Sequence, residues 1–331
     1  MSIAARIDFP DTSNAALHSI EREVDFRPSI LDLQTDPVIE EPTIKQRPTE
    51  TLSEGLILSP LLDVPSSETP FHSSGRAAER TPALDPIDAN VPETALTRLP
   101  YACIGQLVMN FPRHQSVGSA FAIAPDAIMT VGHNLVEHIK DRRTGARRTE
   151  TAKAVRFSPG YNGLGHGAKF GTWTADWAMV CIDWVNASDH RYDMAIVHMK
   201  RNSSGSLSET IGGHLPLGLY PDYYSQWSLF GYPFIASSND NPQMRQVNSV
   251  GAGADTSWPK DQPVATRSTV FRAMSGGPWF SNFDPKNPDT FRVLGMNTYT
   301  RKFVYQYSVY FGDMLRALAE EYKSELARAS A

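Results

Sequence analysis

The sequence predicts an all-β protein built from two packed antiparallel barrels, with a C-terminal helix and a long N-terminal leader of different character. From Tyr101 onward, short runs of β-branched and aromatic residues alternate with Gly, Asn, Asp and Pro, a spacing typical of strands and turns. No long strand–helix–strand spacing is present, which favours antiparallel sheets. The body from Tyr101 to Phe311 is too long for one immunoglobulin-type sandwich and suits two barrels.

The leader, residues 1–98, differs in composition from the body, residues 99–331. The first 100 residues hold 12 of the 24 prolines but only 3 of the 33 aromatic residues, and eight basic against 17 acidic residues. Such a segment buries too little apolar surface to offset its ordering entropy, so we expect it to be extended, either flexible or lying against the body. Asp11–Glu23 and Thr51–Leu62 are its two candidates for helical turns. A tail without a function and a pro-segment or regulatory arm, removed near residues 90–100, are both open.

Composition also limits the partners of the chain. The net charge of −5 gives no basic surface for nucleic acid, and no apolar run approaches the ~18 residues of a membrane span, so neither partner is expected. Two cysteines exclude a disulfide-rich or Cys-rich zinc scaffold. Cys103 and Cys181 either pair or remain two buried thiols. The N-terminus lacks the regions of a secretory signal, which favours the cytoplasm, with non-classical export as the alternative.

The elements expected along the body are strands, followed by one helix. The candidate strands are CIGQLVM (103–109), AFAIA (120–124), AIMTV (127–131), TWTADWAMVCI (172–182), MAIVHM (194–199), WSLFGY (227–232), FRVLGM (291–296) and FVYQYSVYF (303–311). Over Gly312–Leu326 the spacing changes to that of an amphipathic helix, because the apolar residues recur every three or four positions and charges occupy the other face.

Three motifs at strand ends carry the candidate chemistry. They are AIMTVGHN (127–134) with His133, YDMAIVHM (192–199) with Asp193, and MSGGPWF (274–280) with Ser275. Each alone has an ordinary structural explanation: a His at a strand end, a turn Asp that satisfies backbone amides, and a tight Ser-Gly-Gly-Pro turn. Together they indicate more, because a serine becomes a strong nucleophile when an imidazole takes its proton and a carboxylate orients that imidazole. The chain order His, Asp, Ser is the chymotrypsin order.

Residues 100–320 resemble the trypsin-like (chymotrypsin-fold) serine proteases, and most of all the bacterial glutamyl-endopeptidase-like branch. The resemblance is carried by GSAFAIAPDAIMTVGHN (118–134), FSPGYNG (157–163), FGTW (170–173), YDMAIVHM (192–199), FGYP (230–233), MSGGPWF (274–280) and VLGMN (293–297). It implies a double six-stranded antiparallel β-barrel with the active site between the barrels, and no cofactor or metal.

By position in these motifs, the resemblance implies that His133 is the general base, Asp193 its orienting carboxylate and Ser275 the nucleophile. The backbone N–H groups of Ala273 and Ser275 would form the oxyanion hole. The expected activity is serine endopeptidase, acting on a protein or peptide substrate through an acyl-enzyme. The alternative is a catalytically silent pseudo-protease that serves as a binding or scaffold module.

Some positions depart from the family pattern. Ala273 replaces the usual glycine, and its methyl group opposes the backbone turn that aims its N–H. Met274 stands where trypsin-like zymogens carry an aspartate, so activation by a freed N-terminal amine is not available. Asn134 replaces the cysteine that commonly follows the histidine, which removes the disulfide of that loop.

The substrate pocket is expected to include Thr269, Arg272 and Asn297. Thr269 lies near the floor of the pocket in the resemblance, and because it is not an acid, cleavage after Lys or Arg is disfavoured. Asn297 occupies the position of the histidine that meets the substrate carboxylate in glutamate-specific relatives, and it brings no positive charge. Arg272, Arg301 and Lys302 lie close by in sequence and are the candidate sources of that charge, with solvated surface residues as the alternative.

Other patterns are interpreted as structural. HNLVEH (133–138) does not have the spacing of a zinc protease motif, and GYNGLGHGAKFG (160–171) does not fit a phosphate-binding loop. The basic stretch KDRRTGARR (140–148) is interpreted as a solvated loop between barrel strands, with binding of an anionic partner as the alternative. The tryptophans at 173, 177 and 184 are interpreted as core.

Overall fold

The computed structural model describes residues 2–10, 26–28, 39–40, 88–140, 147–163, 168–233, 243–268, 273–301 and 305–329. The two predicted helical turns of the leader lie outside these ranges, as do Thr269 and Arg272 of the predicted pocket. None of the helices within them is long and apolar enough to cross a lipid bilayer.

The first barrel is a closed ring of six antiparallel strands. These are β5 (Ile104–Asn110), β6 (Gln115–Ala124), β7 (Ala127–Thr130), β10 (Ala154–Pro159), β11 (Trp173–Cys181) and β12 (Ala195–Met199). The strand order is β11-β10-β5-β6-β7-β12, and pairing of β11 with β12 closes the ring. Its strands are buried almost throughout, because the inner face fills the barrel while the outer face is covered by other segments. The predicted core tryptophans, Trp173, Trp177 and Trp184, are all buried here.

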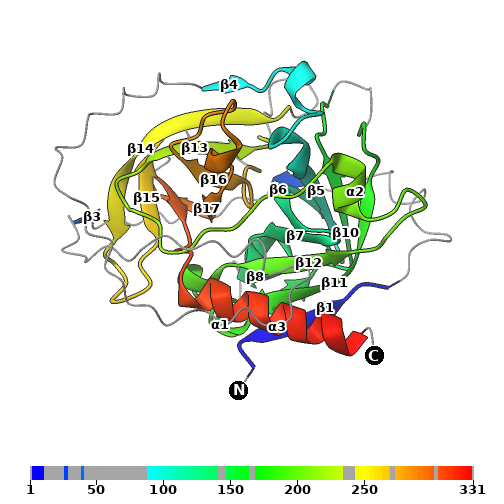
Figure 1. Cartoon of the computed structure of the whole chain (residues 1–331). Helices are drawn as coiled ribbons and strands as arrows, with labels where there is room; N and C mark the ends of the chain where they lie inside the picture. The colour runs from blue at the N-terminus through cyan, green and yellow to red at the C-terminus, as the bar shows by residue number, and fades with distance from the viewer. Residues whose placement is uncertain are drawn as a thin grey trace.

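The second barrel repeats the same strand order. Its strands are β13 (Gln226–Gly231), β14 (Arg245–Asp255), β15 (Val264–Arg267), β16 (Pro278–Ser281), β17 (Val293–Met296) and β19 (Tyr305–Ser308), with β18 (Tyr299–Arg301) beside β19. The order is β17-β16-β13-β14-β15-β19, the same permutation as in the first ring. Between β17 and β19 the described residues form no ladder, and the N–H of Met296 instead donates to Ser308 Oγ at 2.8 Å. The predicted double barrel is confirmed, with this second ring left open in its backbone pairing (Figure 1).

Several elements escaped the sequence prediction. The 11-residue strand β14 has the sequence RQVNSVGAGAD, in which no regular alternation marks a strand. The two ends of the basic stretch lie in a hairpin, in which β8 (Val136–Lys140) pairs with β9 (Arg147–Thr151), while 141–146 lie outside the described residues. Two short helices, α1 (Ile182–Ala187) and α2 (Leu207–Ile211), were also missed. For α2 the sequence held a signal, since Ser206 and Glu209 form a reciprocal capping box.

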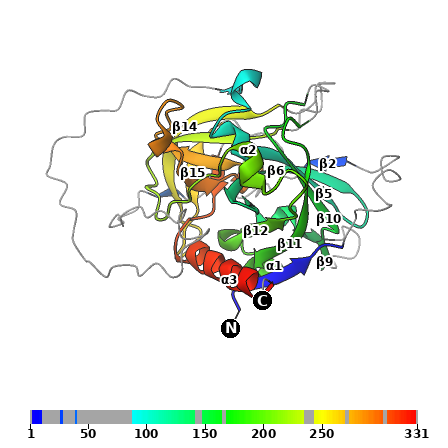
Figure 2. The same ribbon diagram turned by 45° about the vertical axis from the view of Figure 1, so that its right-hand side comes forward.

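The predicted C-terminal helix is α3 (Asp313–Ala329), which packs against the first barrel. Its buried face carries Leu315, Leu318, Ala319 and Tyr322. The ring of Tyr322 lies 5.0 Å from that of Trp177 on β11, and its hydroxyl hydrogen-bonds to Nδ1 of His198 on β12 at 2.9 Å. The helix therefore covers the outside of these two strands, as Figure 2 shows.

The described parts of the leader lie against the body and add short strands to it. β1 (Ala4–Asp8) pairs with β11 beside α3, where the backbone N–H of Ile3 donates to Glu321 at 3.0 Å and Arg6 pairs with Glu325 (Figure 1). β2 (Phe26–Pro28) pairs with β6, whereas β3 (Ile39–Glu40) and β4 (Asp88–Asn90) pair with β14. Residues expected to be extended thus reach both barrels.

The two cysteines are free thiols, each buried in the first-barrel core. Burial raises the pKa of both thiols well above the usual range because a thiolate would be desolvated, and for Cys181 the nearby carboxylates of Asp183, Asp193 and Glu321 act in the same direction. The chain is therefore held together without a disulfide.

The N-terminal strand is expected to stabilise the first barrel. Phe9 is 5% exposed and belongs to its core, so Phe9→Ala should lower the free energy of unfolding by about 3 kcal/mol, measured by urea denaturation. Asp8→Ala is the matched control, because this side chain is 68% exposed and its ion pair with Arg6 contributes less than about 1 kcal/mol. Equal stability of both variants would show that β1 does not dock in solution.

The buried thiols should resist alkylation. Reaction with iodoacetamide requires the thiolate, and a raised pKa keeps Cys103 and Cys181 protonated at pH 8. We expect mass spectrometry to find no adduct on the native chain under conditions that modify both residues in urea. Modification of the native chain at the unfolded rate would contradict the buried positions.

Candidate active site

His133 lies in a single 3-10 turn, Gly132–Asn134, at the end of β7. Gly132 has to be a glycine for a steric reason: a Cβ there would lie 2.6 Å from Cδ1 of Trp184 and 3.1 Å from Oδ1 of Asp193. The absence of that methyl group lets the indole and the carboxylate approach the histidine backbone. The ring of His133 then lies 6.1 Å, centre to centre, from the ring of Trp184. The turn at the end of β7 therefore places the imidazole of His133 beside Trp184 and Asp193.

Asp193 is fully buried just before β12, and both of its oxygens bind His133. Oδ1 accepts the backbone N–H of His133 at 2.7 Å, and Oδ2 lies 2.7 Å from Nδ1 of the same residue. A carboxylate can only accept hydrogen bonds, so it holds the imidazole in the tautomer with the proton on Nδ1. The lone pair then lies on Nε2. This nitrogen is buried and has no hydrogen-bond partner among the described residues.

Ser275 follows Ala273 and Met274 in a tight turn that leads into β16, and its two following glycines are required by close backbone contacts. Gly276 has φ +86°, and a Cβ there would lie 2.2 Å from both the carbonyl oxygen of Ser119 and Oγ1 of Thr130. A Cβ on Gly277 would lie 1.9 Å from the carbonyl oxygen of Phe230. Glycine accommodates both the positive φ and the close approach. Gly276 thus lets this loop approach the first barrel, and Gly277 lets it approach β13 of the second.

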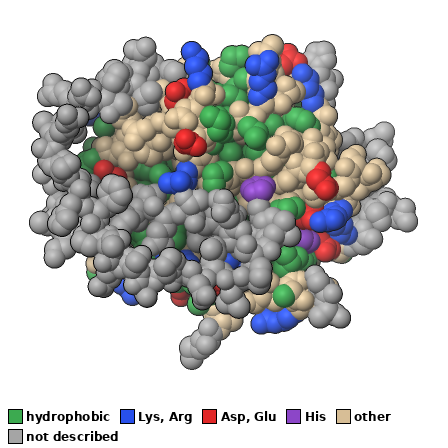
Figure 3. All heavy atoms as spheres, viewed as in Figure 1, with side chains coloured by type: hydrophobic (Ala, Val, Ile, Leu, Met, Phe, Trp, Pro, Cys, Tyr) green, Lys and Arg blue, Asp and Glu red, His purple; other side chains and the backbone are tan. Residues whose placement is uncertain are grey.

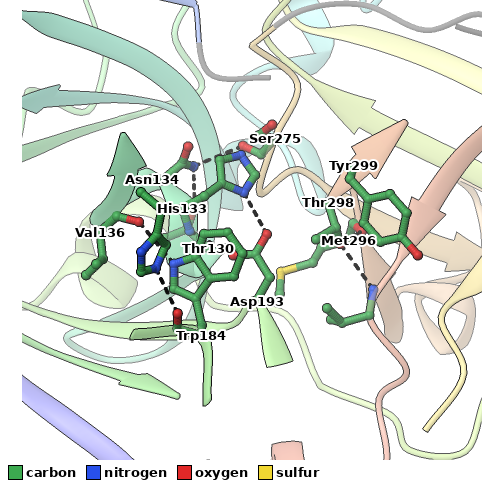
Figure 4. Close-up of polar contacts among 12 residues, drawn as sticks. Thr130, His133, Asn134, Val136, Trp184, Asp193, Ser275, Met296, Thr298 and Tyr299 are labelled. Carbon is green, nitrogen blue, oxygen red and sulfur yellow. Dashed lines mark hydrogen bonds and ion pairs between the residues drawn. The ribbon is translucent and has the colours of Figure 1, made fainter. Parts of the chain in front are cut away.

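Hydrogen bonds between the two barrels place the backbone of Ser275 beside the histidine turn. Its carbonyl oxygen accepts the backbone N–H of Ser119 at 2.8 Å and Nδ2 of Asn134 at 3.2 Å. Nδ2 of Asn134 also donates to Oγ1 of Thr130 at 2.8 Å. Figure 4 shows the imidazole of His133 between Asp193 on one side and Ser275 on the other. Asn134, which replaces the usual cysteine, therefore links the loops of His133 and Ser275 by a hydrogen bond.

Ala273 adopts the backbone conformation that a glycine would take at this position. Its φ is +67°, in the left-handed region that a methyl group disfavours. Its carbonyl oxygen accepts a hydrogen bond from Oγ of Ser119 at 3.2 Å. The replacement of glycine has not prevented the turn, although it leaves local strain.

Asn297 lies in the interior of the second barrel, directly after β17. Its Oδ1 accepts the indole N–H of Trp279 at 2.8 Å, and its Nδ2 donates to the carbonyl oxygen of Phe230 at 2.8 Å. The side chain is 1% exposed, and its two hydrogen bonds connect the end of β17 to β16 and β13. This gives Asn297 a structural role, while its part in the substrate pocket stays a prediction, as do those of Thr269 and Arg272.

Aromatic side chains beside the site were not identified by sequence reasoning. The ring of His190 lies 5.7 Å from that of Trp184 and 5.4 Å from that of Tyr299. The Tyr299 hydroxyl donates to the buried carboxylate of Asp255 at 2.7 Å. A clue was present, since His190 lies three residues before Asp193. Tyr299, however, comes from the second barrel, and no local sequence pattern connects it with His190.

The described residues contain no cluster of three His, Cys, Asp or Glu side chains that would hold a metal ion. On the face seen in Figure 3, basic and acidic side chains are interspersed, and no large patch of one sign is visible.

Comparison with known proteins identifies the fold. No protein-family model and no curated protein sequence match the chain. Among solved structures, the thermostable serine protease AL20 from an extremophilic microorganism aligns with a TM-score of 0.57 and 20% identity, over 70% of this chain and 99% of that one. Protease Anisep from Arthrobacter nicotinovorans aligns with a TM-score of 0.53 and 20% identity, over 69% of this chain and 98% of that one. A Glu endopeptidase in complex with MPD aligns with a TM-score of 0.53 and 15% identity, over 73% of this chain and 99% of that one. The chain has the trypsin-like double-barrel fold.

Replacing Asn297 should affect stability more than cleavage preference. Asn297→Ala leaves the buried Trp279 N–H and Phe230 carbonyl without their partner, which should lower the free energy of unfolding by about 2–4 kcal/mol. Urea denaturation measures this loss, and profiling on a peptide library measures preference. A stable variant with a changed preference at the residue before the cleaved bond would instead support the pocket assignment.

Proposed function

We propose that the protein is a serine endopeptidase. The observation that carries the proposal is the buried pair of bonds from Asp193 to His133, both 2.7 Å long. These bonds leave Nε2 as the proton acceptor, on the side of the ring where Figure 4 shows Ser275. An imidazole oriented in this way next to a serine is the arrangement that activates a hydroxyl as a nucleophile.

In the proposed reaction, Oγ of Ser275 attacks the carbonyl carbon of the peptide bond while Nε2 of His133 takes the hydroxyl proton. The imidazolium is stabilised by Asp193, whose full burial strengthens the interaction. When the tetrahedral intermediate collapses, the C–N bond breaks and Nε2 gives its proton to the leaving amine. Water then attacks the ester carbonyl while Nε2 takes one of its protons. When this second tetrahedral intermediate collapses, the bond between the acyl carbon and Oγ breaks, Nε2 returns the proton to Oγ of Ser275, and the carboxylic acid product is released.

The developing negative charge on the carbonyl oxygen requires donors that are already in place. The backbone N–H groups of Ala273 and Ser275 are the proposed donors, as the motif positions imply. The left-handed conformation of Ala273 supports this role, because it is one that glycine, the usual residue at this motif position, adopts without strain. Ala273 is also held by a cross-barrel hydrogen bond through its carbonyl group.

The proposal includes no preference for glutamate. A substrate carboxylate buried in a pocket requires a positive charge, and Asn297 has none. Its amide is also engaged within the barrel by Trp279 and Phe230.

Removing the nucleophile should abolish activity. The wild-type chain is expected to form a covalent adduct with a fluorophosphonate probe at Ser275 and to hydrolyse peptides, and Ser275→Ala should do neither. Ser281→Ala, which replaces a nearby serine on β16, is the matched control and should label normally.

Asp193→Asn should lower kcat for peptide hydrolysis by about 10⁴-fold, because the amide favours the tautomer of His133 that cannot accept the serine proton.

The pseudo-protease is the competing function, and the same experiment separates the two. A folded wild-type chain that neither labels nor cleaves would overturn the proposed activity and favour a binding or scaffold role. Circular dichroism and intact mass establish that the tested chain is folded and complete. Cleavage that persists in Ser275→Ala would exclude Ser275 as the nucleophile.

A further inference from the structure

We propose that Ser119 is a positioning residue that holds Ala273 in the conformation required for the oxyanion hole. The inference rests on the proposed serine endopeptidase function, and it assigns to this chain a device that substitutes for the missing glycine. Ser119 lies on β6 in the first barrel, whereas Ala273 precedes β16 in the second, 154 residues later.

Every polar group of Ser119 is used. Its Oγ accepts the backbone N–H of Tyr232 at 2.9 Å and donates to the carbonyl oxygen of Ala273 at 3.2 Å. Its N–H donates to the carbonyl oxygen of Ser275 at 2.8 Å, and its own carbonyl oxygen accepts Oγ1 of Thr130 at 2.8 Å. Because Tyr232 supplies a donor to Oγ, the single hydroxyl proton of Ser119 is directed at Ala273.

One residue thus binds two carbonyl groups of the nucleophile loop. The carbonyls of Ala273 and Ser275 flank Met274, and both accept hydrogen bonds from Ser119. The peptide planes at both ends of this short segment are therefore fixed against the first barrel. For φ of Ala273 to rotate toward negative values, either these two hydrogen bonds would have to break or the chain before Ala273 would have to move.

This restraint matters because Ala273 occupies φ +67° with a side chain that favours negative φ. Glycine at this position would need no restraint, since it visits positive φ freely. With alanine, loss of the Ser119 hydroxyl removes the interaction that opposes relaxation. The loop then populates a relaxed state in which the N–H of Ala273 no longer points where the family's glycine would direct it.

A double-mutant cycle in the full chain tests this role. Ser119→Ala should lower kcat, and the rate of fluorophosphonate labelling, by about tenfold with little change in KM, which corresponds to the cost of one left-handed alanine. Ala273→Gly supplies the second single variant of the cycle, and its own kcat is the reference for the combined variant. Adding Ser119→Ala to Ala273→Gly should lower kcat by less than about threefold, because glycine does not require the restraint. Undiminished kcat in Ser119→Ala, or an equally large loss when Ser119→Ala is added to Ala273→Gly, would overturn the proposal.

A second measurement does not depend on activity and so distinguishes this proposal from the proposed function. If Ser119 holds Ala273 in the strained conformation, Ala273→Gly should stabilise the chain with Ser119 and give little or no stabilisation in the Ser119→Ala background, where the strain has already relaxed. Equal effects in both backgrounds would contradict the inference even if the wild-type chain were inactive.

Ser228→Ala provides the matched control for both measurements. Ser228 is fully buried on β13 and donates to Oδ1 of Asn248 at 2.8 Å, so its replacement removes a buried serine hydroxyl elsewhere in the second barrel. Its effect on unfolding should add to that of Ala273→Gly without coupling. Coupling as strong as that of Ser119 would mean that the effect is a general loss of packing.

Discussion

The geometry of the site depends on the contact between the two barrels at Ser119. The backbone N–H of this residue donates to the carbonyl of Ser275, and Gly276 then approaches the Ser119 carbonyl more closely than any side-chain-bearing residue could. The first barrel alone supplies His133 and Asp193, and the second supplies Ser275. Without this cross-barrel contact, Ser275 would have no defined distance from His133. The candidate site therefore lies at the interface, and neither barrel contains all three residues.

Burial strengthens the polar interactions at this interface, because water does not screen them. Asp193 is completely buried and is satisfied by two donors of a single residue, so its charge acts on His133 with little screening by water. Around Ser275, a polar network of Ser119, Thr130 and Asn134 provides the fixed donors that a buried backbone turn needs. Asn134 in this network joins the loops of His133 and Ser275 by a hydrogen bond, in a chain whose two cysteines are both free.

The N-terminal leader shows the limit of compositional reasoning. An acidic, proline-rich and aromatic-poor segment is expected to lack a core of its own, yet β1 pairs with β11 and Phe9 enters the first-barrel core. The reason is that an exposed strand edge supplies the hydrogen-bond partners and the apolar surface that the segment does not provide itself. A few apolar residues within a polar stretch are then enough to dock it, and average composition conceals them.

The sequence by itself determined the strand content, the amphipathic face of α3 and the chemical identity and order of His133, Asp193 and Ser275, because strand alternation, helical periodicity and short motifs are local properties. The helical spacing placed Leu315, Leu318 and Tyr322 on the buried face, and the Ser-Gly-Gly turn indicated a close backbone approach. Only the tertiary structure decided what that turn approaches, that Ser119 binds Ala273, that Asn297 serves the interior of the second barrel, and that β14 is a strand at all. These features depend on pairing between residues far apart in the chain. Such pairing follows from how the two sheets curl and meet, and no window of neighbouring residues contains that information.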